Sequence, residues 1–216
     1  MKFIHIVFFF QSSTCKKEGY HCYNAIENFP RNMWTIHGLW PNYKNITNIP
    51  GWCNGKNDIE IEIKNQTLYN YMKTYFPGLY STNERFWGYE YNKHGFCYSK
   101  RNNINVSEYE QYFLKTVSIY EKYDLKNIFI NMFDKNLEKG DKKVTELQFE
   151  KYFEKVGIKK GSFFLICNLV NINNKKVPYI SEIRIRFDLD FNLYIDDQNK
   201  DKIKDICPDE FFVEFL

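Results

Sequence analysis

The chain has 216 residues, of which 44% are hydrophobic and 19% aromatic, a composition typical of one globular domain with an aromatic-rich core. We therefore expect a single domain over residues 1–216. The formal net charge of +3 is compatible with a polyanionic partner but is far below that of a strongly basic duplex-binding domain. No segment approaches the roughly 20 consecutive apolar residues of a membrane span.

The first half of the chain predicts strands, then a loop, then helices. Apolar runs indicate the strands, an excess of Asn, Gly and Pro indicates the loop, and apolar periodicity indicates the helices. The expected strands are 3–11 and 33–39, the second ending at Pro41; the loop is 42–58; and the helices are 67–76, stopping at Pro77-Gly78, and 86–99.

The first apolar run has a competing interpretation. A charged start at Met1-Lys2 followed by an apolar segment resembles a short signal peptide. The segment contains His5, lacks a small-residue cleavage site and leads straight into Gln11 and Cys15. We therefore favour a buried first strand, with any signal peptide already removed.

The second half predicts helices followed by strands. Residues 107–134 predict two helices divided near Asp124, and a further helix ends near Gly157. Each helical segment opens with a capping box, in which Ser or Thr precedes Glu or Gln by three residues: Ser107 with Glu110, and Thr145 with Gln148.

Residues 163–172 and 183–191 predict the last strands. The first is an apolar run, and the second alternates Ile, Leu or Phe with Arg or Asp, the clearest strand pattern in the chain. Strands from both ends and helices from the middle predict an α+β fold, with a central antiparallel sheet packed against several helices.

Six cysteines and three Asn-x-Ser/Thr sequons favour the secretory route. The cysteines lack the spacing of a zinc site, so disulfides are favoured over metal binding or free thiols, and no metal site is predicted. The sequence alone does not choose among the pairings. The cysteines are Cys15, Cys22, Cys53, Cys97, Cys167 and Cys207, and the glycosylation candidates are Asn45, Asn65 and Asn105.

Two histidine-glycine segments are the most informative feature of the chain. Residues 34–41 read Trp-Thr-Ile-His-Gly-Leu-Trp-Pro, and residues 86–97 read Phe-Trp-Gly-Tyr-Glu-Tyr-Asn-Lys-His-Gly-Phe-Cys. They contain His37 and His94, two of only four histidines. Two histidines with a nearby lysine and glutamate are sufficient for metal-free phosphoryl transfer by general acid–base catalysis, which points to RNA as the substrate.

A structural role is the alternative for each of these residues. On a regular helix Glu90, Lys93 and His94 stand at i, i+3 and i+4 and share one face. The same spacing is also typical of a surface salt bridge between Glu90 and Lys93. His37 lies in an aromatic, strand-like segment, where a lone histidine is often a buried core residue.

The two strings together resemble the active-site segments of the ribonuclease T2 family, which includes plant self-incompatibility ribonucleases and fungal acid ribonucleases. The likeness covers most of the chain, because residues 3–15 resemble the family's first strand and first cysteine, and residues 179–188 its late strand. It implies a monomeric, secreted or vacuolar/lysosomal endoribonuclease. Such an enzyme cleaves single-stranded RNA with broad base specificity, needs no cofactor and leaves DNA intact.

The resemblance also implies a role for each residue of the expected site. The ribose 2′-hydroxyl attacks the adjacent phosphate and yields a 2′,3′-cyclic phosphate, which is then hydrolysed. By resemblance, His94 is the base and His37 the acid, although the sequence alone does not assign them. Lys93 would stabilise charge on the phosphoryl oxygens. Glu90 would hold Lys93 or His94 in place.

Substrate contacts are expected at five further positions. Trp40 resembles the family's stacking platform for the base 5′ of the cut, with a core tryptophan as the alternative. Asn42 stands where an aspartate often contacts that base, Phe86 would line the pocket of the 3′ base, and Gln11 would face the groove. Tyr89 departs from the family, which usually has a phosphate-binding histidine there, so we expect weaker phosphate binding.

By similarity we also expect the disulfides Cys15–Cys22, Cys53–Cys97 and Cys167–Cys207. Closing the second loop would stabilise the fold by ~3–4 kcal/mol. Arg186 stands where many relatives have another cysteine, so one of their disulfides is missing here. Trp87 and Tyr91 are assigned to packing.

Two other classes of function compete with an enzyme. A secreted T2-like glycoprotein with weakened catalysis, acting as a binding or immunomodulatory factor, is favoured only by Tyr89. A structural disulfide-rich extracellular domain would explain the cysteines but not the two histidine segments.

Overall fold

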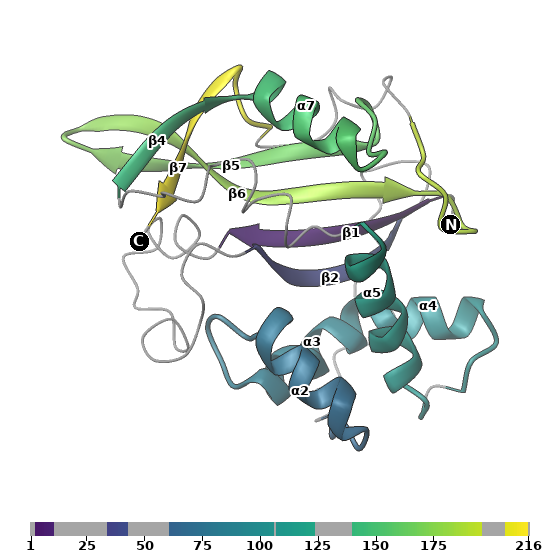
Figure 1. Cartoon of the computed structure of the whole chain (residues 1–216). Helices are drawn as coiled ribbons and strands as arrows, with labels where there is room; N and C mark the ends of the chain where they lie inside the picture. The colour runs from purple at the N-terminus through teal and green to yellow at the C-terminus, as the bar shows by residue number, and fades with distance from the viewer. Residues whose placement is uncertain are drawn as a thin grey trace.

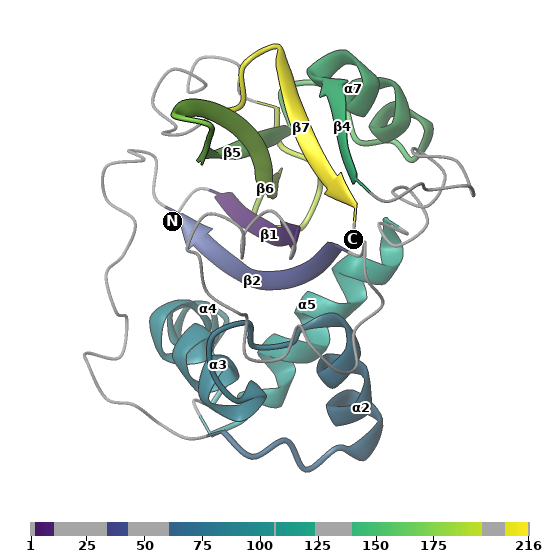
Figure 2. The same ribbon diagram turned by 90° about the vertical axis from the view of Figure 1, so that its left-hand side faces the viewer.

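A six-stranded sheet runs through the molecule, with a group of helices at one end and a single helix at the other (Figures 1 and 2). The computed structural model describes residues 3–10, 34–42, 61–105, 107–123, 140–195 and 206–215. The strands are β1 (Phe3–Phe10), β2 (Trp34–Asn42), β4 (Gly140–Thr145), β5 (Phe163–Ile172), β6 (Lys175–Phe187) and β7 (Glu210–Phe215). The expected α+β fold is confirmed.

The sheet joins strands from both ends of the chain. The order is β2-β1-β6-β7-β4, and β5 pairs with β6 outside this path. Pairing is antiparallel except between β6 and β7, which meet in parallel at Tyr179 and Phe212. At the β2 edge the strand continues through Pro41, beyond the predicted end at Leu39, because an edge strand tolerates a residue without an N–H.

Helices cover the two ends of the sheet. In Figures 1 and 2, α2 to α5 gather beside β2, while α7 lies beside β4. The helical segments are α2 (Gln66–Tyr75), α3 (Asn83–Glu90), the π-helix η2 (Tyr91–Gly95), α4 (Phe96–Arg101), α5 (Glu110–Lys122) and α7 (Glu146–Lys155). No helix in these ranges is long and apolar enough to cross a membrane.

One predicted capping box is confirmed and the other is wrong. Thr145 and Gln148 cap α7 as expected, and Gly157 follows the helix with φ +81. Ser107 does not cap α5, because its backbone N–H and its hydroxyl both bond to Asn105 Oδ1. Glu110 Oε1 instead accepts backbone N–H groups at the start of α2, including that of Asn65 at 3.1 Å. The predicted second helix after Asp124 lies outside the described residues.

The alternating strand is displaced from its predicted position. β6 begins at Lys175 and ends at Phe187, because the Asp188 side chain accepts backbone N–H groups of the next residues and closes a turn there. On the predicted apolar face Ile183, Ile185 and Phe187 are buried, whereas Leu189 and Phe191 lie past the end of the strand and are only half-buried. Arg186, which the alternation assigns to the polar face, is fully buried as well; its Nε lies 3.3 Å from His5 Nε2.

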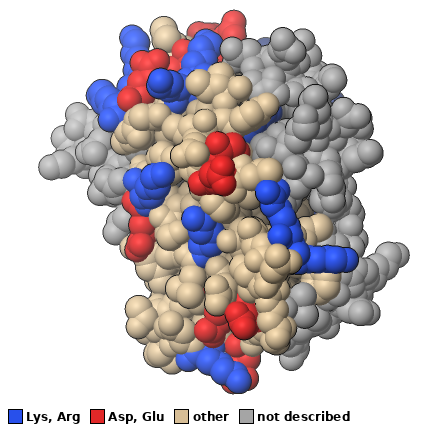
Figure 3. Space-filling model, turned by 90° about the vertical axis from the view of Figure 1, so that its right-hand side faces the viewer, with Lys and Arg blue, Asp and Glu red and all other residues tan. Residues whose placement is uncertain are grey.

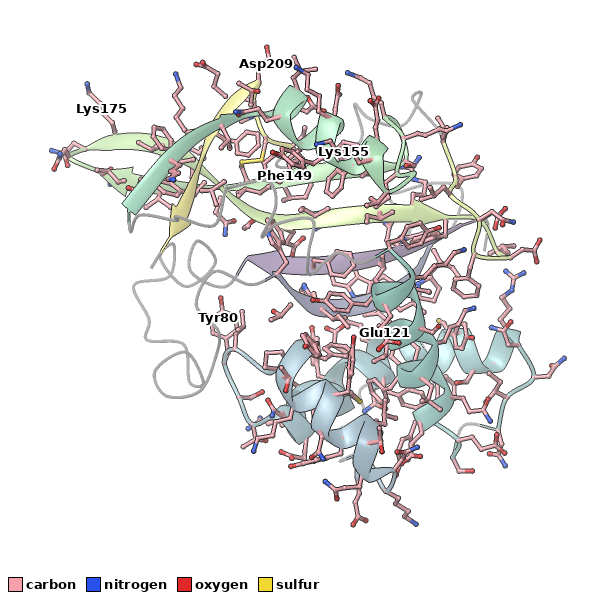
Figure 4. The ribbon with its side chains drawn as sticks, viewed as in Figure 1. Tyr80, Glu121, Phe149, Lys155, Lys175 and Asp209 are labelled. Carbon is pink, nitrogen blue, oxygen red and sulfur yellow. A yellow bond between two sulfur atoms is a disulfide. The ribbon has the colours of Figure 1, made fainter. Side chains whose placement is uncertain are left out.

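Aromatic residues supply the largest side chains of the core. Nine of the ten largest fully buried side chains in the described ranges are aromatic, and the tenth is Arg186. Phe149 of α7, labelled in Figure 4, packs against Phe211 of β7, with ring centres 5.6 Å apart. The predicted disulfide Cys167–Cys207 is present. Cys97 is disulfide-bonded too; Cys15, Cys22 and Cys53 lie outside the described residues, so the other two pairings stay predictions.

Surface charge is mixed. On the face drawn in Figure 3, Lys and Arg side chains alternate with Asp and Glu and form no continuous basic tract within the described part. This agrees with the small net charge of +3. On this face the described residues therefore offer a polyanion no broad basic surface.

Candidate active site

A β-bulge in β2 places His37. The register between β1 and β2 pairs Val7 with Gly38 and Phe8 with Ile36, and so skips His37. Side chains alternate along a strand, so residues 37 and 40 would face opposite sides of a regular β2. The bulge adds one residue and turns both side chains to the same face, where the rings of His37 and Trp40 lie 4.7 Å apart.

A π turn places the second histidine. The helix predicted over 86–99 is interrupted by η2, in which the N–H of Phe96 bonds to the carbonyl of Tyr91, five residues earlier. Such single turns are frequent at functional sites. His94 lies in this turn and is 1% exposed.

The predicted common face of Glu90, Lys93 and His94 is wrong. Glu90 and His94 are buried, whereas Lys93 turns toward Tyr89, donates a hydrogen bond to its hydroxyl at 3.1 Å and lies 5.1 Å from its ring centre. The π turn has more residues per turn than an α-helix, which moves Lys93 out of line with the other two. The salt bridge between Glu90 and Lys93, the alternative explanation, is also absent from the described contacts.

Glu90 is the centre of the site. Its side chain is fully buried; Oε1 lies 3.5 Å from His37 Nε2, and Oε2 accepts a 2.9 Å hydrogen bond from Trp40 Nε1. One carboxylate from α3 therefore connects the histidine and the tryptophan of β2.

Trp40 lies between the two histidines. Its indole stacks on His94, with ring centres 4.8 Å apart and planes 20° apart, and meets the His37 ring edge-on. Neither ring nitrogen of His94 has a hydrogen-bond partner among the described residues. The indole thus covers one face of an imidazole whose two nitrogens are buried and make no hydrogen bond among the described residues.

Glu182 of β6 is a site residue that sequence analysis missed. Its Oε1 accepts a 3.2 Å hydrogen bond from His37 Nδ1, and its Oε2 accepts two hydrogen bonds from Arg184, at 3.0 and 2.6 Å. Glu182 precedes the alternating run, and no local pattern marks it. Only the pairing of β6 with β1, and of β1 with β2, brings it beside His37.

The two histidines have opposite electrostatic environments. Burial disfavours protonation of His37, but Glu90 and Glu182 outweigh it and raise the pKa of His37 above 6.5. Burial dominates at His94, where it lowers the pKa to about 4 against the attraction of Glu90. Burial alone would raise the pKa of Glu182, but its hydrogen bond to His37 and the charge of Arg184 hold that pKa at about 2.

The glycine after each histidine marks a close approach. A Cβ on Gly38 would overlap Glu90 Oε2 and Trp40 Nε1, and a Cβ on Gly95 would overlap the Tyr91 ring. Tyr112 adds a second constraint, because its hydroxyl accepts from the N–H of Leu39 at 3.1 Å and donates to the carbonyl of Leu39 at 3.0 Å. Helix α5 is thereby tied to β2 two residues after His37.

The remaining predicted residues lie at the edge of the site, in the core or outside the described ranges. Phe86 is half-buried, with its ring 6.1 Å from that of His37. Asn42 is buried, and its amide nitrogen lies 3.1 Å from His5 Nδ1 and donates to the Trp40 carbonyl. Trp87 and Tyr91 are core residues. Gln11 and Asn45 lie outside the described residues, and Asn65 and Asn105 are exposed.

A six-stranded sheet with a histidine at a bulge, facing a helical segment that supplies a buried glutamate and a second histidine, defines an α+β protein with two histidines on either side of one carboxylate. A model of the ribonuclease T2 family matches residues 1–201, and the chain belongs to that family.

Curated relatives match the chain over part of their length. It is 32% identical over 112 residues to ribonuclease Rh of Rhizopus niveus, which covers 46% of this chain and 47% of that protein. It is 33% identical over 117 residues to ribonuclease T2 of Danio rerio, covering 54% of this chain and 42% of that protein. The chain thus spans less than half the length of these relatives.

Solved structures share the fold over nearly the whole chain. Ribonuclease MC1 from bitter gourd seeds has a TM-score of 0.71 at 21% identity, over 98% of this chain and 99% of that one. Human RNase T2 has a TM-score of 0.68 at 20% identity, over 100% of both chains. At these identities the likeness shows the fold alone.

Proposed function

We propose that this protein is an endoribonuclease that cleaves single-stranded RNA by attack of the 2′-hydroxyl on the adjacent phosphate. The product is a 2′,3′-cyclic phosphate and a free 5′-hydroxyl, and water then opens the cyclic phosphate. The observation that carries the proposal is that two histidines lie near one buried glutamate and that their pKa values are shifted in opposite directions. Family membership supports it.

His94 acts as the base. Its pKa of about 4 leaves the imidazole neutral over most of the acidic range, so a ring nitrogen accepts the proton of the 2′-hydroxyl. His37 acts as the acid, because Glu90 and Glu182 keep it protonated to higher pH. It donates its proton to the leaving 5′-oxygen. In the second step the two histidines exchange these roles.

Lys93 stabilises the negative charge that builds up on the phosphoryl oxygens. Its ammonium has no carboxylate contact among the described residues and is partly exposed beside the site. When the Lys93 ammonium moves from the Tyr89 hydroxyl to a phosphate oxygen, its neutral acceptor is replaced by a charged one. A hydrogen bond to a charged acceptor is the stronger of the two. Glu90 holds His37 rather than Lys93.

Trp40 has to move when RNA binds. The 2′-hydroxyl must come within hydrogen-bond distance of a His94 ring nitrogen, whereas here His94 is buried and the Trp40 indole covers one face of its ring. Release breaks the hydrogen bond from Trp40 Nε1 to Glu90 and frees an aromatic face on which a base stacks. Stacking is tolerant of base identity, in line with broad specificity.

Two further substrate contacts are proposed from the geometry: Phe86 lies beside His37 and borders the 3′ base, and Tyr89 offers one neutral hydrogen bond to a phosphate. Asn42 and Gln11 are proposed as base contacts from the family resemblance alone. No cofactor enters the proposal, since the ribose supplies the nucleophile. Disulfide bonds support a secreted or vacuolar/lysosomal protein.

A binding protein with weakened catalysis is the second candidate. Two observations favour it: Tyr89 carries no charge where relatives are expected to have histidine, and Trp40 covers His94. Substituting Tyr89→His separates the two candidates. If the protein is an enzyme, the variant binds RNA more tightly and cleaves it faster, whereas a binding protein gains affinity without cleavage.

The test is cleavage of matched RNA and DNA oligonucleotides in EDTA from pH 4 to 8, with products identified by mass spectrometry. We expect cleavage of RNA only, with a cyclic phosphate at early times, and loss of cleavage in His94→Ala. An unchanged thermal midpoint in that variant shows that its loss is chemical. Absence of cleavage by the parent protein at every pH would falsify the proposal.

A further inference from the structure

We propose that Glu182 is a positioning residue for His37, holding the imidazole through Nδ1 so that Nε2 delivers the proton to the leaving oxygen. This inference rests on the proposed function, because it concerns the orientation of the proposed acid. It adds a carboxylate from β6, about 90 residues after the second histidine segment, to a site that sequence analysis limited to the two segments.

Strand pairing puts this carboxylate on the correct face. Phe9 of β1 pairs with Thr35 on one side and with Glu182 on the other. His37 follows Thr35 by two residues, and its contact with Glu182 shows that the side chains of His37 and Glu182 lie on the same face of the sheet. Glu182 therefore reaches His37 across β1, and their contact measures 3.2 Å.

The two nitrogens of His37 face two different carboxylates. Nδ1 donates to Glu182, while Nε2 lies 3.5 Å from Glu90. A hydrogen bond at Nδ1 fixes the tautomer and the ring angle, as a carboxylate behind a catalytic imidazole does in general. The longer contact leaves Nε2 free to exchange its partner for the 5′-oxygen of the substrate.

Arg184 holds Glu182 in turn. The guanidinium donates from Nε and Nη2 to the same oxygen, Oε2, so that Oε1 is left for His37. The side chains of Arg184, Glu182 and His37 are 23%, 14% and 17% exposed, which shields their contacts from water. Arg184 also lies 5.4 Å from the Trp40 ring centre.

Glu182 and Glu90 have separate tasks. Glu90 also bonds to Trp40, so its contacts change when the indole leaves. Glu182 has no contact with the moving indole among the described contacts and keeps its hold on Nδ1 throughout. Glu90 from α3 and Glu182 from β6 act directly on His37. His94 of η2 interacts electrostatically with His37 and is itself beside Lys93, and Arg184 of β6 is bonded to Glu182.

The variants Glu182→Gln and Glu182→Ala test this role. Glu182→Gln keeps the size and an acceptor for Nδ1 but removes the charge. We expect kcat to fall on the order of ten-fold in Glu182→Gln and a hundred-fold in Glu182→Ala, with KM little changed, because proton transfer is affected rather than binding. The basic limb of the kcat/KM profile moves to lower pH by about 1 unit in Glu182→Gln.

Matched controls separate positioning from structure. Glu210→Gln removes a carboxylate paired with Lys143 on the far strands and should leave kcat and the pH profile unchanged. In a His37→Ala background, Glu182→Gln should cost no further activity, since its effect passes through the imidazole. A variant that only lowers the thermal midpoint, with the profile unmoved, would overturn the proposal.

Imidazole NMR gives a readout independent of cleavage. Following the ring nitrogens of His37 through a pH titration should show Nδ1 protonated in the parent and a lower midpoint in Glu182→Gln. If the parent protein cleaves no RNA, the proposed function fails while this titration still tests the contact. Identical His37 titrations in the parent and Glu182→Gln would refute the role of Glu182.

Discussion

Replacing Gly38 by alanine should disable the site with only a moderate loss of stability. The added methyl would overlap Glu90 Oε2 and Trp40 Nε1, and these two atoms are joined by a 2.9 Å hydrogen bond. The methyl fits only if that bond breaks and the Glu90 carboxylate turns away. Glu90 would then lose its contact with His37 as well.

The expected magnitude follows from those contacts. A hydrogen bond to a charged group contributes about 1.5–3 kcal/mol, and overpacking of a core costs a similar amount, so we expect the free energy of unfolding to fall by about 2–3 kcal/mol. Catalysis is lost to a similar extent in free energy, because the acid loses a carboxylate partner. We expect kcat for RNA cleavage to fall on the order of 100-fold.

Gly157→Ala is the matched control. Gly157 has φ +81, and no atom lies within 4 Å of the place that the alanine methyl would take, so alanine costs about 1–2 kcal/mol of backbone strain without touching the site. Urea unfolding measures the stability of both variants, and cleavage of an RNA oligonucleotide measures kcat. Equal kcat in Gly38→Ala and Gly157→Ala would refute the argument that the glycine serves the contact between Glu90 and Trp40.

Three further outcomes are expected. The profile of kcat/KM against pH should be bell-shaped. The rate falls below about pH 4, where His94 becomes protonated, and it falls again as the pH rises through the raised pKa of His37 and the acid loses its proton. A rate independent of pH between 4 and 8 would contradict these assignments. Lys93→Ala should lower kcat by about 100-fold, whereas Lys100→Ala, an exposed lysine on α4, should cleave like the parent. Tyr112→Phe removes two hydrogen bonds to β2 and should lower the free energy of unfolding by about 1–3 kcal/mol, measured in urea; an unchanged midpoint would show that these bonds do not stabilise the strand.

Local patterns predicted much of the fold. The capping box at Thr145, the first strands and the helix now seen as α2 were found from neighbouring residues, because caps and apolar periodicity act within a few positions. Ser107 shows the limit of such patterns. Its expected partner Glu110 serves the backbone of Asn65 instead, a contact between segments 45 residues apart.

At the candidate site, too, local patterns predicted some features, whereas others depend on contacts between distant segments. The two histidine segments contain His37, Glu90, Lys93 and His94, so the proposed chemistry could be inferred from residue types and spacing. Trp40 was expected at the substrate, but its place between the histidines was not. That position depends on how β2 packs against α3 and η2.

Residue types and local patterns were enough to predict the fold class, the family resemblance and the two histidine segments. Three features emerge only in the folded chain: the bulge that turns His37 beside Trp40, the π turn that separates Lys93 from Glu90, and the approach of Glu182 from β6. Each of them depends on strand register or on packing between distant segments. The different pKa values of the two histidines, and with them the proposed assignment of base and acid, follow from those contacts.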